Sequence, residues 1–220
     1  MINFKEGKNI RAAIMIALVI SLIFNIVLSI DSHKYKYKAG KEACNGVLSI
    51  RTINESSNEI LKNVIDNKTI SNEDLLKLYM NYTDISENIS DLWYEYNYYI
   101  EEKSILDFHK INNIDEEIGI ISEVNERIED FIRSILDLEM KTENDEMHTS
   151  DEMLYMFTEM YNISTDIKNM YSDFVDPKLS GLKGEKRIKK LIKEYYWIDI
   201  LEKLNEINDK YLDVEFILNK

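Results

Sequence analysis

The sequence predicts an all-α protein in which an N-terminal transmembrane helix is followed by an antiparallel helical bundle of four to five long helices. Its 220 residues include six glycines and one proline, too few turn-forming residues for a sheet-based fold of this length. Apolar residues recur every three to four positions over most of the chain, as on the buried face of a helix. Residues 12–30 form an uncharged run of 19 residues, which would be about 28 Å long as a helix.

This apolar run divides the chain into four regions. We expect a short tail over residues 1–9, a signal-anchor helix over 10–30, a basic juxtamembrane segment over 31–42 and the bundle domain over 43–220. A cleaved signal peptide is the alternative for residues 10–30, but its apolar core would run about 7 to 15 residues and end at an A-x-A-like site. The stretch LSIDSHKYK that follows has no such site. We therefore expect an uncleaved, single-pass protein of the cell membrane.

The charges that flank the predicted span oppose one another. They are Lys5, Lys8 and Arg11 before it, and Lys34, Lys36, Lys38 and Lys41 after it. The positive-inside rule therefore gives conflicting orientations. A short basic tail is awkward to translocate, so we expect the bundle on the extracytoplasmic side.

Five helical segments are predicted after the span, without strands or internal repeats. The first runs to about Val64 and ends at DNKTISNED, where Ser71 or Asn72 can cap a second helix over residues 72–103. The buried seam of this second helix is expected to comprise Leu75, Leu78, Tyr82, Ile85, Ile89, Leu92, Tyr96 and Tyr99.

The remaining segments follow the same logic. The third begins near Ile114, and the polar run KTENDEMHTSDE separates it from a fourth that Ser150 caps. The seam of the fourth is expected to comprise Met153, Met156, Met160, Ile163, Ile167, Met170 and Phe174. The fifth runs from about Ile188 to Leu218, with a local slip of its spacing between residues 198 and 204.

Short connections make successive helices antiparallel neighbours. The aromatic stretch SDLWYEYNYYIEE and the basic start of the fifth segment should then meet at the end of the bundle that faces the membrane. Tyr and Trp favour the headgroup zone, and lysines favour anionic lipid. We therefore hypothesise a membrane-interface collar of Tyr94, Tyr98, Lys183, Lys186, Arg187, Lys189, Lys190, Lys193 and Trp197. The alternative is a solvated face whose cations pair with the many carboxylates of the bundle.

A ligand cavity between helices is a second hypothesis. Its lining would be Trp93, Tyr96, Tyr99, Met156 and Met160. Methionine packs adaptably around ligands, but the same helical spacing also fits ordinary core.

Catalytic, metal and cofactor sites are not predicted. The sequence has no nucleophile motif, no phosphate-binding glycine loop and no paired Glu-x-x-His ligands. After residue 42 the chain carries 20 basic and 38 acidic residues, and such a field repels nucleic acid.

We therefore expect a non-enzymatic, membrane-anchored bundle that acts in sensing or partner docking. Its partners would be the lipid bilayer and either another protein or a second copy of the chain. Anchor plus bundle is the general plan of bacterial extracytoplasmic sensor domains, an analogy of architecture alone. The alternatives are a small-ligand-binding bundle and a homo-oligomeric structural coiled-coil module.

Overall fold

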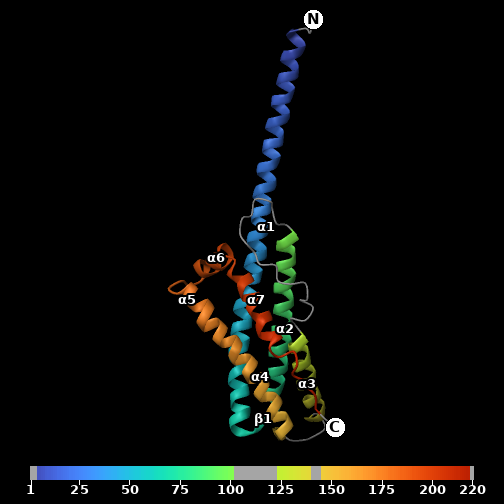
Figure 1. Cartoon of the computed structure of the whole chain (residues 1–220), viewed down its shortest axis with the longest axis vertical. Coiled ribbons are helices and arrows are strands. Elements are labelled where there is room, and N and C mark those ends of the chain that lie inside the picture. The colour runs from blue at the N-terminus through green and yellow to red at the C-terminus, as the bar shows by residue number, and fades with distance from the viewer. Residues whose placement is uncertain (1–3, 102–122, 140–144, 219–220) are drawn as a thin grey trace. The chain divides into compact units, whose positions relative to one another are not determined.

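The computed structural model describes residues 4–101, 123–139 and 145–218. The helices are α1 (Phe4–Asn67), α2 (Asn72–Glu101), α3 (Glu123–Glu139), α4 (Asp151–Met170), α5 (Asp176–Leu179), α6 (Glu185–Lys193) and α7 (Tyr196–Asp209) (Figure 1). A π-helical turn, η2 (Tyr171–Val175), joins α4 to α5. The predicted helical-bundle class is confirmed. The predicted start of the third segment near Ile114 lies outside the described residues.

The chain divides into two compact units, Met1–Ala39 and Gly40–Lys220. In the first unit, the large apolar side chains between residues 14 and 30 are 49% to 67% exposed. None of the helices in the described part of the chain is both long and apolar enough to cross a membrane. The predicted transmembrane helix over residues 10–30 therefore stays a prediction.

Both predicted helix caps are confirmed. The Ser71 hydroxyl accepts a hydrogen bond from the backbone N–H of Asp74 at 3.1 Å. The Ser150 hydroxyl likewise accepts from the backbone N–H of Met153 at 3.2 Å. Each cap satisfies a donor that the first helical turn leaves without a backbone partner, so α2 and α4 begin where the sequence predicts.

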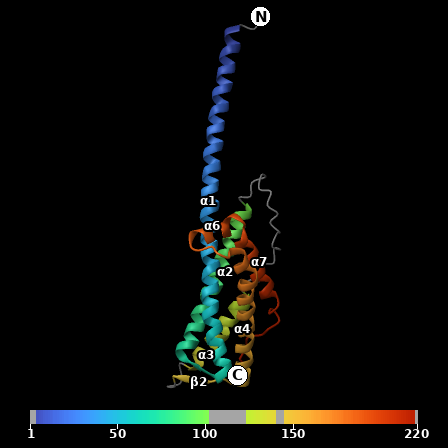
Figure 2. The ribbon, with the colours of Figure 1, turned by 90° about the vertical axis from the view of Figure 1, so that its left-hand side faces the viewer.

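Two short strands correct the expectation that the fold has none. β1 (Thr69–Ser71) pairs antiparallel with β2 (Glu146–His148), with Ile70 opposite Met147. Strands of three residues are too short to show the alternating pattern by which strands are recognised. This ladder joins the starts of α2 and α4, and both helices run from the same end of the bundle (Figures 1 and 2).

The predicted seams form the core of the second unit. All eight seam residues of α2 are 4% exposed or less. On α4, the seam from Met153 to Met170 is also buried, and Phe174, in η2, is half-buried. The core therefore follows the 3.6-residue period read from the sequence.

The fifth segment is two helices rather than one with a slipped seam. The backbone of Tyr195 adopts a left-handed conformation, with φ of 56°, and separates α6 from α7. The break therefore falls before residue 198 rather than between 198 and 204. Tyrosine rarely adopts this conformation, so the local sequence does not predict the break. After Asp209 the chain leaves the helix, so Val214 and Leu218 are not helical.

Candidate functional site

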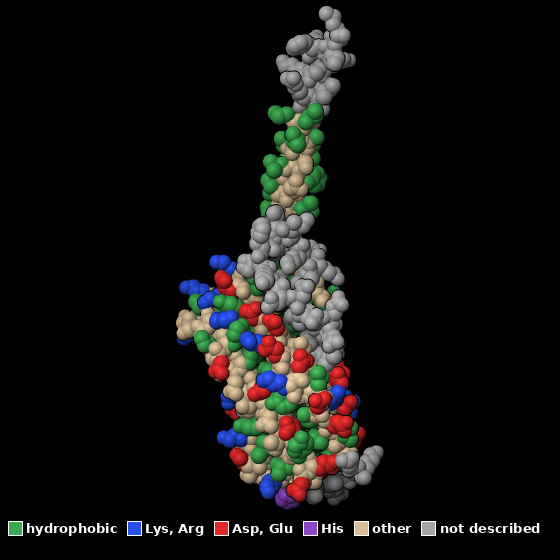
Figure 3. Space-filling view, in the orientation of Figure 1, with side chains coloured by type: hydrophobic (Ala, Val, Ile, Leu, Met, Phe, Trp, Pro, Cys, Tyr) green, Lys and Arg blue, Asp and Glu red, His purple; other side chains and the backbone are tan. Residues whose placement is uncertain are grey.

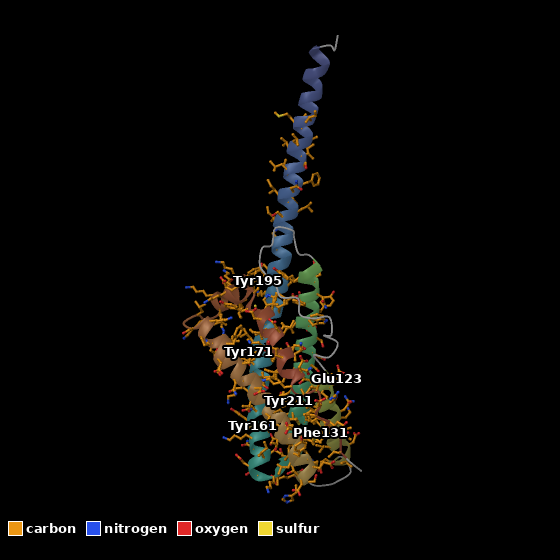
Figure 4. All side chains as sticks on the ribbon, in the orientation of Figure 1. Glu123, Phe131, Tyr161, Tyr171, Tyr195 and Tyr211 are labelled. Carbon is orange, nitrogen blue, oxygen red and sulfur yellow. The ribbon has the colours of Figure 1, made fainter. Side chains whose placement is uncertain are left out.

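The aromatic residues of α2 and α7 meet in one cluster, as the antiparallel order predicts. The ring of Tyr99 lies 5.3 Å from that of Tyr195 and 6.1 Å from that of Trp197, the latter edge-on. Trp93 stacks on Tyr96 at 5.1 Å. Figure 4 shows Tyr195 at the junction of α6 and α7. The cluster joins α2 to the C-terminal helices.

The predicted interface residues separate into exposed and buried groups. Tyr94 and Tyr98 are 71% and 38% exposed, so both remain available to a surface. Trp197 is only 1% exposed. This corrects its assignment to the interface, because the packing of α7 against Tyr99 encloses the indole ring in the core.

The basic side chains of α6 also divide by helical face. Lys186, Lys189 and Lys193 share the exposed face, and Lys183 precedes them in an exposed turn. The opposite face carries the fully buried Leu191. Ile192, beside that face, packs on Gly40, where an added Cβ would lie 3.0 Å from the isoleucine. One side of α6 therefore packs against the bundle and the other faces solvent.

Arg187 and Lys190 hold α6 in place. The Arg187 Nη2 lies 3.5 Å from an Asp176 carboxylate oxygen, and the Lys190 ammonium donates to the Lys178 carbonyl at 2.5 Å. These two members of the predicted collar therefore have partners inside the protein. The alternative expectation, that the cations pair with carboxylates, holds for Arg187 and for Lys189, which lies 3.3 Å from Glu185.

Asp176 is the centre of this bracing. It accepts two hydrogen bonds from the Arg51 guanidinium, at 2.5 and 2.9 Å. These bonds hold the pKa of the Asp176 carboxyl below its ordinary value. Arg51 also lies over the ring of Tyr171, whose hydroxyl donates to the Val47 carbonyl at 2.6 Å. The contacts tie η2, α5 and α6 to α1.

The predicted ligand-cavity residues lie in two places. Tyr96 and Tyr99 sit near the C-terminal end of α2, whereas Met156 and Met160 sit in the first turns of α4. Because α2 and α4 start at the same end, the helical rise separates the two groups by roughly 25 Å along the bundle. All four side chains are buried. The structure therefore does not bring the five predicted residues into one cavity.

A groove that the sequence did not reveal lies between α1 and α2. It has a volume of about 480 Å³. Its lining comprises Glu42, Ala43, Asn45, Gly46, Ser49, Asn88, Asp91, Leu92, Tyr94 and Glu95. Its polar residues fall on the outward positions of two separate helices, where they resemble ordinary solvated surface in the sequence. Only the pairing of α1 with α2 brings them together.

Cys44 and the acidic side chains show no reactive arrangement in the described residues. The Cys44 thiol is fully buried, and burial raises its pKa to about 12. A thiol that stays protonated is a poor nucleophile. Among the described residues, no three His, Cys, Asp or Glu side chains are arranged to hold a metal ion.

Comparison with known proteins identifies no relatives: no family matches the chain, and no curated protein or solved structure is significantly similar to it.

Proposed function

We propose that this chain is a non-enzymatic, single-pass membrane protein whose helical bundle senses or docks a partner on the extracytoplasmic side. The observation that carries this proposal is the exposed apolar surface of residues 14–30. Thirteen large apolar side chains there are each at least 49% exposed. Soluble proteins rarely leave so extensive an apolar surface in water.

The distribution of these side chains favours lipid over a partner helix. Neighbouring residues such as Leu18, Val19 and Ile20 are all exposed, and successive helical positions are rotated by about 100°. The apolar surface therefore covers most of the circumference of the helix, interrupted by a line of Ser21, Asn25 and Ser29. A partner helix covers one stripe, whereas hydrocarbon covers the whole circumference. The helix also satisfies its own backbone polar groups, as a bilayer requires.

The docking part of the proposal draws on the surface of the bundle. Leu76 and Met80 lie one turn apart on α2 and are 50% and 57% exposed. The groove between α1 and α2 is a second candidate contact surface. A bundle with a filled core and such surfaces is suited to recognition rather than to chemistry.

Alkaline extraction of membranes tests the anchor. In the full chain, the double variant Val19→Glu with Ile23→Glu places two carboxylates one turn apart in the apolar stretch. Each costs about 2.5–3.5 kcal/mol near the centre of a bilayer, so we expect the protein to move from the carbonate-resistant pellet to the supernatant. The matched control, Leu76→Glu with Met80→Glu, adds the same charges at the same spacing on the bundle and should stay in the pellet. Wild-type protein in the supernatant would contradict the anchor.

A thiol label tests the orientation. Lys62 is exposed on α1, so Lys62→Cys should react with a membrane-impermeant maleimide on intact cells if the bundle lies outside. Cys44 needs no replacement, because burial keeps it unreactive until the protein is denatured. Labelling that appears only after lysis would place the bundle in the cytoplasm.

A further inference from the structure

We propose that the exposed lysine face of α6, formed by Lys183, Lys186, Lys189 and Lys193, seats the bundle on anionic lipid headgroups. This inference rests on the proposed membrane anchor and names the surface of the bundle that faces the lipid. It narrows the predicted collar to the lysines whose side chains are exposed to solvent.

The first support is the selective orientation of the cations. Lys186, Lys189 and Lys193 lie on one side of α6, away from the buried Leu191. Of the lysine face, only Lys189 has a carboxylate within 4 Å among the described residues, namely Glu185. Glu185 is itself exposed, so this pair is weak and exchanges readily. Figure 3 shows Lys and Arg side chains gathered over the α5 and α6 region.

The second support is charge complementarity. The chain has a formal net charge of −14, with 41 acidic residues against 27 basic ones. An anionic membrane therefore repels most of the bundle surface and attracts the lysine face. Because the attraction falls off within about one Debye length, this face should set which side of the bundle approaches the lipid.

The third support is chain connectivity. Ile192 of α6 packs on Gly40, which lies ten residues after Ile30. Ten residues span at most about 35 Å whatever their path. The covalent chain therefore limits how far Gly40, on which α6 packs, can lie from the end of the proposed anchor.

The fourth support is that α6 is held rigidly against the rest of the bundle. Arg187 and Lys190 point inward to Asp176 and to the Lys178 carbonyl, and Asp176 is held in turn by Arg51. A face presented by a braced helix loses little conformational freedom on contact.

Energy transfer between the bundle and labelled headgroups tests the inference in the full chain. A donor dye on Ser180→Cys reports from an exposed position beside α6, and the buried Cys44 stays unlabelled. The protein is reconstituted in phosphatidylcholine vesicles with or without about 30% phosphatidylserine. We expect stronger transfer with phosphatidylserine, and loss of this increase in about 0.5 M salt.

A matched pair of triple variants isolates the lysine face. Lys186→Gln, Lys189→Gln and Lys193→Gln together should lower the equilibrium constant for seating by roughly a hundredfold, about fivefold per lysine. Lys62→Gln, Lys77→Gln and Lys168→Gln remove the same charge from exposed positions elsewhere and should leave the transfer unchanged.

Two measurements separate the failures. Carbonate resistance of the same vesicles reports insertion alone. Insertion without any dependence on phosphatidylserine would overturn the lysine-face inference and leave the anchor intact, whereas no insertion would overturn both. Binding of a short RNA that the α6 triple variant abolishes and vesicles do not compete would assign the face to nucleic acid and also overturn the inference.

Discussion

Residues 14–30 of α1 and the helix α2 are both helical and rich in apolar residues, yet their apolar side chains differ in exposure. In the first, apolar side chains occupy most of the circumference of the helix and remain exposed. In α2 they form one seam, from Leu75 to Tyr99, that is almost fully enclosed. Helix formation is thus common to both, and the angular distribution of apolar residues decides what must cover them.

The same contrast defines what each region needs from its surroundings. The seam of α2 is covered by other helices of the same chain, among them α3, α7 and, at Leu92, the Gly46 turn of α1. Residues 14–30 have no comparable seam, because Ser21, Asn25 and Ser29 are their only polar residues and large apolar side chains occupy most of the other positions. A region of this kind requires an apolar solvent, whereas α2 requires neighbours of the right shape.

The largest expected effect is a difference in the free energy of unfolding between matching variants of the two regions. Leu78→Ala empties a fully buried position and should lower the free energy of unfolding by about 2–5 kcal/mol. Leu18→Ala removes the same atoms from the exposed stretch and should leave bundle unfolding unchanged. Urea titration in detergent, followed by circular dichroism, measures both. Equal destabilisation by the two variants would show that residues 14–30 belong to the folded core.

A smaller effect is expected at the polar contact between α1 and α4. The buried Asn54 side chain donates to the Ser164 carbonyl at 2.8 Å, and the Ser164 hydroxyl donates to the Asn54 carbonyl at 3.3 Å. Asn54→Ala should cost about 1–3 kcal/mol of stability. Asn63→Ala, at an exposed position of the same helix, is the control and should cost much less. An unchanged urea midpoint for Asn54→Ala would rule out a stabilising role for this contact.

Acid should loosen the bracing of α6. The folded-state pKa of Asp176 is lowered, chiefly by hydrogen bonds from Arg51. Its contribution to stability is therefore complete above its ordinary pKa and is lost as pH falls from about 4 through the lowered value. Because the Asp176 side chain is 42% exposed, solvent screening limits the effect to about 1 kcal/mol or less.

The Asp176→Asn variant isolates this contribution. Its stability should change less than that of the wild type between pH 5 and pH 3, as measured by urea titration at each pH. Parallel pH profiles of stability for the two proteins would exclude Asp176 as the source of the loss of stability in acid.

The smallest effect is expected on the exposed side of α2. Leu76→Glu alters a half-exposed residue next to the fully buried Leu75 and should change the free energy of unfolding by no more than about 0.5 kcal/mol. Thermal unfolding monitored by circular dichroism checks this. A loss as large as that of Leu78→Ala would mean that the buried surface of α2 extends beyond its predicted seam.

Sequence reasoning succeeded where a local rule determines the structure. The caps at Ser71 and Ser150 follow from hydroxyl groups placed before acidic first turns, and the seams of α2 and α4 follow from helical periodicity. The meeting of the α2 aromatics with Tyr195 and Trp197 followed from the antiparallel order. It failed at β1 and β2, whose pairing depends on residues more than 70 positions apart.

The candidate site was only partly predictable for the same reason. Periodicity places Lys186, Lys189 and Lys193 together, but it does not say which side of α6 is covered. That depends on the contact of Ile192 with Gly40 and on the reach of Arg187 to Asp176. Trp197 was assigned to an interface because tryptophan favours one, whereas its enclosure beside Tyr99 is a tertiary contact.

By itself, the sequence determined the helical class, the starts of α2 and α4, the seams of those helices and the apolar character of residues 14–30. These features depend on interactions within one or two helical turns, or on a repeat that one helix displays alone. The tertiary structure alone decided the left-handed break at Tyr195, the groove between α1 and α2, and which lysines of α6 face outward. Each of these features depends on groups that are distant in the chain. The interactions between those groups form only after packing has brought them together.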